Sequence, residues 1–172
     1  MNLRQLLVER HLPFATLIFD IQVALLDRHP ARARAAVDQL QQLLEQHARV
    51  EEELLLPMFV RYVPRPERGA SPELFVAEHA RLRSLITDLQ RMLLPRESTL
   101  TDVEAITLLE KVHPLKNLLQ HHELREETLL APALEETVGD TLDPWLLELD
   151  AAFSATSRGA AAVPPGGDVV SP

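Results

Sequence analysis

The chain of 172 residues contains no cysteine. This absence excludes disulfides, iron–sulfur clusters, thiolate zinc sites and cysteine nucleophiles. Aromatic residues make up only 4% of the chain, and no apolar run approaches the length of a membrane span. His, Asp and Glu therefore remain as the strong metal ligands.

Acidic residues outnumber basic ones, with 26 Asp and Glu and 17 Lys and Arg, which gives a formal net charge of -9. Nucleic acids and anionic lipids both attract a basic surface, so we expect neither as a partner. The first residues, MNLRQLLVERHLPF, become charged before an apolar stretch develops and do not resemble a signal peptide. We expect a cytoplasmic protein.

Apolar residues recur with the period of an α-helix along most of the chain, and strand-like alternation is missing. The pattern predicts four long amphipathic helices, over residues 3–28, 31–56, 72–93 and 101–136. Three short connections between them favour an all-α, up-down-up-down four-helix bundle. After Gly139, DPWLLELDAAF predicts one short extra helix. We therefore expect one domain over residues 1–153 and a disordered tail over 154–172, where core residues are scarce.

One phrase occurs twice, as HARVEEELLLP at 47–57 and HELREETLLAP at 122–132. Both copies have His, Glu, Glu, Leu, Leu and Pro at the same offsets. Residues four apart lie on one face of a helix, so His47 is beside Glu51 and His122 is beside Glu126. Each pair falls inside an otherwise apolar stripe, which indicates that it faces the core.

Depth along the bundle brings two more histidines into the same layer. His11 and His79 each lie about eight residues into their helices, and His47 and His122 each lie ten residues before a proline near the helix end. Antiparallel packing aligns the start of one helix with the end of the next, at about 1.5 Å per residue. The bundle should therefore hold four imidazoles and two carboxylates in one slab.

Carboxylates and unpaired histidines are costly to bury among leucines, and metal ions would remove both costs. Six ligands exceed the need of one tetrahedral zinc, whereas two ions bridged by Glu51 and Glu126 would each receive two histidines. Such ligation in a helical bundle is typical of di-iron and di-manganese sites. The neighbouring Glu52, His121 and Glu127 lie about 100° round the helix from the main ligands, so we expect them to support the ligands or to be exposed. One of them could serve as an extra ligand where Phe75 leaves a place free.

A single His on the first and third helices, with His-x-x-x-Glu on the second and fourth, resembles the hemerythrin-like family, the HHE cation-binding domain. The resemblance covers about residues 3–136 and implies that the metal ligands are His11, His47, Glu51, His79, His122 and Glu126. It implies two non-haem iron ions with oxo or hydroxo and carboxylate bridges, and we rank manganese and zinc below iron. Oxygen-carrying hemerythrins have a further His where this chain has Phe75, so a five-histidine carrier site is incomplete.

The resemblance also implies that the protein binds or senses oxygen, nitric oxide or the iron and redox state. This role requires no turnover, and we prefer it to an enzyme. One alternative is a di-iron enzyme that handles peroxide or other reactive oxygen species. The other is a partner-binding helical bundle with a vestigial or zinc-filled site. The expected small ligand is dioxygen, nitric oxide or peroxide, and the sequence does not identify a protein partner.

Overall fold

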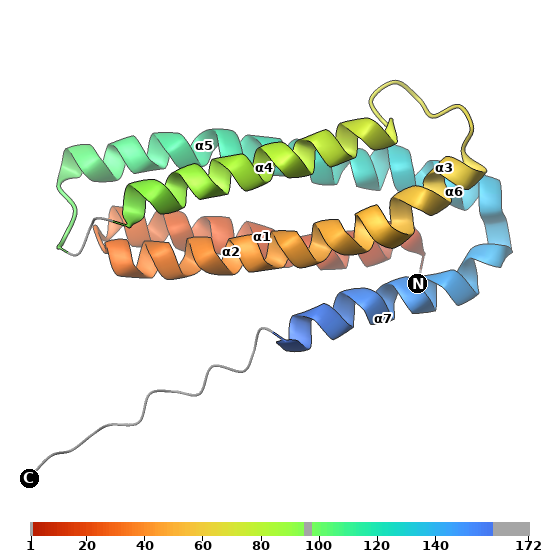
Figure 1. Cartoon of the computed structure of the whole chain (residues 1–172), viewed down its shortest axis with the longest axis horizontal. Helices are drawn as coiled ribbons and strands as arrows, with labels where there is room; N and C mark the ends of the chain where they lie inside the picture. Colours follow the sequence, from red (N-terminus) through yellow and green to blue (C-terminus); the bar gives the residue numbers. More distant parts are fainter. Residues whose placement is uncertain (1, 95–97, 160–172) are drawn as a thin grey trace, which may run out of the picture.

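The computed structural model describes residues 2–94 and 98–159, and it is helical with no strand over this part of the chain. Long helices that pack side by side form the body of the molecule (Figure 1). The elements in chain order are α1 (Leu3–Leu26), α2 (Pro30–Val50), η1 (Glu51–Leu55), α3 (Leu56–Tyr62), α4 (Pro72–Leu93), α5 (Asp102–Arg125), η2 (Glu126–Leu130), α6 (Ala131–Val138), η3 (Gly139–Leu142) and α7 (Asp143–Gly159). No helix in the described ranges has both the length and the apolar character that a bilayer crossing requires.

The long helices form the predicted four-helix bundle. Each packs against the next along the chain, and α5 returns to pack against α1 (Figure 1). Polar side chains set the helix starts. The Ser71 hydroxyl accepts a hydrogen bond from the backbone N–H of Leu74, and Thr101 forms a capping box with Glu104. The predicted beginnings of the third and fourth long helices are therefore confirmed to within one residue.

The second and fourth long helices are not regular to their ends. Each changes into one π-helical turn, η1 or η2, before continuing as α3 or α6. Pro57 and Pro132 stand two residues after the last residue of these turns. A proline ring clashes with the carbonyl four residues earlier and has no N–H to donate, so a regular α-helix is disfavoured here. Instead the N–H groups of Leu56 and Ala131 bond to carbonyls five residues back, at Glu51 and Glu126.

Buried apolar residues form two separate clusters along the bundle. The first joins α1, α2, α4 and α5 and contains Phe14, Leu40 and Leu108. The second contains Leu3, Phe59 and Leu149, and draws on α3, α6 and α7 at the other end. The predicted slab of His and Glu residues lies between the two clusters in chain position on every long helix.

Helix α7 is longer than the sequence suggested. Leu146, Leu149 and Phe153, which are spaced three and four residues apart, pack into the second cluster. The helix then continues to Gly159, so residues 154–159 are helical although we assigned them to a disordered tail. One reason is that Ser154 accepts a hydrogen bond of 3.0 Å from Arg10 on α1. The rest of the expected tail, residues 160–172, lies outside the described residues.

The first cluster should carry much of the folding free energy. Replacing Leu40, which is 1% exposed, with Ala should lower the free energy of unfolding by roughly 2 to 5 kcal/mol. The matched control is Leu12→Ala, because Leu12 is 63% exposed and its removal leaves no cavity. Urea unfolding of both variants measures the difference, and equal losses would contradict this assignment of the core.

Candidate metal centre

The structure brings all six predicted ligands into one buried layer. One imidazole comes from each long helix, and each repeated phrase adds a glutamate at the first residue of its π turn. None of the six is more than 5% exposed. The residues are His11 on α1, His47 on α2, Glu51 in η1, His79 on α4, His122 on α5 and Glu126 in η2.

Each glutamate reaches two histidines, one with each carboxylate oxygen. Glu51 places Oε1 at 2.6 Å from Nε2 of His47 and Oε2 at 3.0 Å from Nε2 of His79. Glu126 places Oε2 at 3.0 Å from Nε2 of His11 and Oε1 at 3.1 Å from Nε2 of His122. Both carboxylates therefore lie between two pairs of histidines.

These contacts define two groups of four ligands that share both glutamates. Each group has ligand atoms within 4.8 Å of one another. We call position I the group with His11 and His47, and position II the group with His79 and His122. Two metal ions, each held by two imidazoles and one oxygen of each carboxylate, would use all six residues.

The spacing of the donor atoms fits metal ions. Ligand atoms about 2.0 to 2.2 Å from one ion lie roughly 3 Å apart when they occupy adjacent corners of its coordination shell. The distances between imidazole nitrogens and carboxylate oxygens above fall close to this value. In position II the Nε2 atoms of His79 and His122 are themselves 3.0 Å apart, so both are aimed at one point. Imidazole and carboxylate donors suit iron, manganese and zinc.

Carboxylates hold the far side of three of the imidazole rings. Nδ1 of His11 lies 2.7 Å from Glu127, and Nδ1 of His79 lies 2.8 Å from Glu52. An ionised carboxylate can only accept, so each Nδ1 carries a proton and each Nε2 faces the centre. Glu52 and Glu127 are thus placed in the supporting arrangement that the sequence suggested.

Two differences concern the residues around the ligands. Glu78 was missed, although it is buried and lies 3.0 Å from Nδ1 of His122. Its only sequence signal is its place beside His79, because the contact crosses from α4 to α5. His121 differs from Glu52 and Glu127, because, of the supporting and exposed roles expected for it, the structure gives it the exposed one. It lies about 100° round the helix from His122. No contact of His121 with the layer exists within the described residues.

Protons on His11 and His122 help to balance the buried carboxylates when no ion is bound. Burial by itself lowers the pKa of His11 and His122, but Glu126 raises both, with Glu127 acting on His11 and Glu51 on His122. The pKa of His11 becomes about 9 and that of His122 about 10. Burial raises the pKa of Glu51, yet the facing histidines hold it well below its ordinary value. Metal ions would displace these protons, so binding should release them.

Phe75 is fully buried and packs edge-on against His122, with ring centroids 5.8 Å apart. It offers no ligand atom. The fifth histidine of an oxygen-carrying centre is therefore replaced by an apolar wall, as the sequence comparison indicated.

Comparison with known families gives one match. The model described as the hemerythrin HHE cation binding domain matches residues 2–139, which include all six candidate ligands and end before α7. No curated protein and no solved structure matched the chain.

Removal of one terminal ligand should lower the metal content. We expect His47→Ala and His122→Ala each to lose about one ion or more per chain, because each removes an imidazole from a different position. Elemental analysis after dialysis measures the loss. His121→Ala is the matched control, since this exposed neighbour should leave the content unchanged. Two tightly held ions in either buried-histidine variant would contradict the ligand assignment.

The metal-free protein should lose stability at alkaline pH. The folded-state pKa values of His11 and His122 are raised above 6.5, so their contribution is fully present below about pH 6.5 and is lost as the pH rises through about 9 to 10. We expect the melting temperature to fall by roughly 5 to 10 °C from about pH 7 to about pH 10. Calorimetry tests this, with metal-loaded protein as the control that should change less. A melting temperature that stays constant or rises would contradict this account.

Proposed function

Because the chain belongs to the hemerythrin HHE cation-binding domain family, we propose that it is a non-haem di-iron protein that binds or senses oxygen, nitric oxide or the iron and redox state. The family and the buried His and Glu clusters make it a metal-binding protein. The observation that carries the finer proposal is that positions I and II share both glutamates. Two iron ions so bridged could change oxidation state together and accept a small ligand.

The number of protein ligands leaves room for a further ligand on a six-coordinate ion such as iron. Each position has two imidazole nitrogens and two carboxylate oxygens. Four ligands complete the tetrahedral shell that zinc prefers in structural sites, but they leave free places on a six-coordinate ion. Such free places are what a diatomic ligand or a bridging oxygen needs. Manganese fits the same donors and ranks second.

The surrounding residues orient the ligands and exclude water from the layer. Glu52, Glu78 and Glu127 fix the orientation of three imidazole rings. Apolar clusters on both sides of the layer restrict the access of bulk water, which strengthens the electrostatic attraction between carboxylates and cations. This environment supports reversible binding of a small uncharged ligand.

A di-iron enzyme that handles peroxide is the second candidate, and one residue favours it. Glu123 lines a groove of about 250 Å³ between α1 and α5, and burial raises its pKa to about 7. A carboxyl group with this pKa can take up or deliver a proton near neutral pH. Its charge interacts with His11 and Glu126, so it could serve chemistry at the metal layer.

Metal analysis and visible spectroscopy test the proposal. Protein purified from cells grown with ample iron should contain two irons per chain and show ligand-to-metal absorption. Azide or oxygen added to the reduced protein should change that spectrum, and many turnovers of peroxide per iron would instead favour the enzyme. His122→Ala should lose the spectrum, whereas His121→Ala should keep it. One zinc per chain, or no metal that can be restored, would reject the di-iron proposal and favour a partner-binding bundle.

A further inference from the structure

The two metal positions are held by different surroundings, although the ligands themselves are nearly symmetric. Position II has a carboxylate behind each of its imidazoles, and each of these carboxylates is paired with an arginine. Position I has one such carboxylate, and among the described residues that carboxylate pairs with no arginine. The two positions therefore differ in the residues that contact the ligands and not in the ligands themselves.

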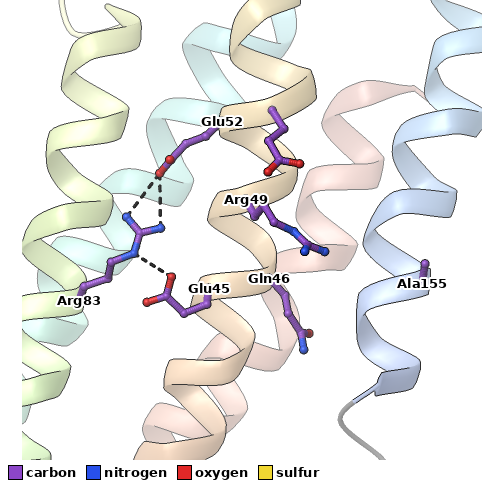
Figure 2. Close-up of a pocket in the computed structure, with 7 residues that line it drawn as sticks. Glu45, Gln46, Arg49, Glu52, Arg83 and Ala155 are labelled. Atoms are coloured by element: carbon purple, nitrogen blue, oxygen red, sulfur yellow. Dashed lines mark hydrogen bonds and ion pairs between the residues drawn. The ribbon is translucent and has the colours of Figure 1, made fainter.

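On the side of position II, Arg83 and Arg125 hold the supporting carboxylates. Nη1 of Arg83 lies 3.4 Å from Oε1 of Glu52, the oxygen that contacts His79. Nε of Arg83 is also 2.9 Å from Glu45, so the guanidinium spans two carboxylates, as Figure 2 shows. Arg125 forms an ion pair with Glu78 in the same way.

These contacts, from arginine to carboxylate to imidazole, fix the imidazoles of position II. A carboxylate behind a ligating histidine sets its tautomer, its ring orientation and its basicity, and its loss typically costs 10- to 100-fold in metal affinity. An arginine that holds the carboxylate reduces the freedom of both the carboxylate and the imidazole in front of it. His79 and His122 are thus oriented before any ion arrives.

On the side of position I, His47 is packed rather than hydrogen-bonded at its far side. Over the described part of the chain no hydrogen bond involves its Nδ1. Its ring instead contacts Phe14 and Phe153, each at 5.1 Å between centroids. Glu127 supports His11, but within the described residues no arginine pairs with Glu127. The imidazoles of position I are therefore less firmly oriented than those of position II.

Position I also lies next to an opening. A cavity of about 60 Å³ is lined by His47, Phe153, Arg10 and Gln46, among others, and has room for a few water molecules. Phe153 belongs to α7, which lies beyond the residues that the family model matches. Arg10 ties α7 to α1 through Asp150 and Ser154. A helix added to the family domain thus covers the histidine that has no carboxylate behind it.

Charge makes any loading stepwise. The two shared carboxylates carry two negative charges, and the first divalent ion neutralises them. The second ion then meets a weaker attraction than the first, because those two charges are already neutralised and the first cation lies nearby. The supporting residues decide which position fills first.

We propose that position II binds its ion first and more tightly, and that position I takes up and releases its ion past Phe153. This inference rests on the proposed two-metal function and deepens it, because occupancy of position I would then follow the available metal concentration. Glu52 and Glu78 act as positioning residues for position II. Phe153 controls exchange at position I.

Titration of the metal-free full-length chain with Co²⁺, followed by visible absorption and calorimetry, tests the order. We expect two steps that differ by roughly tenfold or more in affinity. His47→Ala should keep the tighter step, and His122→Ala should lose it. Two equal steps, or the reverse pattern in the variants, would overturn this inference alone. Fewer than two ions bound by the unaltered chain would overturn the two-metal function as well.

Two pairs of variants test the supporting residues. Glu52→Gln should weaken the tighter step by roughly 10- to 100-fold and leave the weaker one, whereas Glu53→Gln, at the exposed neighbour, should change neither.

Phe153→Ala should speed the release of one of the two ions to a chelator several-fold, whereas Leu147→Ala, at a 73% exposed site on α7, should not. Melting curves of the metal-free variants report whether each is folded. Unchanged affinities in folded Glu52→Gln, or unchanged release in folded Phe153→Ala, would overturn the proposal.

Discussion

The fold depends on the balance of charge in one buried layer. Glu51 and Glu126 are each 1% exposed, and an ionised carboxylate without compensation is very costly at such a place. His11 and His122 supply compensation as protonated partners when no ion is present. All four imidazoles would serve as ligands when metal is bound. Both states require all four helices to meet at the same depth. The layer therefore constrains the register of the whole bundle, while the apolar clusters on either side supply most of the burial.

The two π turns place the glutamates of this layer. A regular α-helix would carry the carbonyl of the residue four before Pro57 or Pro132 into the proline ring. The π turn relieves that clash and begins at the glutamate in both copies of the repeated phrase. Single π turns inside α-helices are frequent at functional sites. Here the same turn occurs twice, so the two halves present their carboxylates to the centre in the same manner.

The residues that support the ligands, unlike the ligands themselves, differ between the two metal positions. Arg83 and Arg125 back the carboxylates of one position, while the other is covered by the aromatic ring of Phe153 from α7. A pair of metal ions with matching ligands can thus have unequal affinity and unequal access. Under the proposed two-metal function, one ion would stay in place while the occupancy of the other changes.

The sequence alone was enough to predict an all-α bundle, the helix starts after Ser71 and Thr101, and the layer of six His and Glu residues. These features follow from helical period, capping and depth, which are properties of one helix at a time or of simple antiparallel packing. The π turns were overlooked, although the prolines that follow them were visible. Contacts such as Glu78 with His122, the exposure of His121 and the cover by α7 were decided only by the tertiary structure. Each depends on how one helix is rotated and shifted against another, and no periodicity within a single helix specifies that rotation.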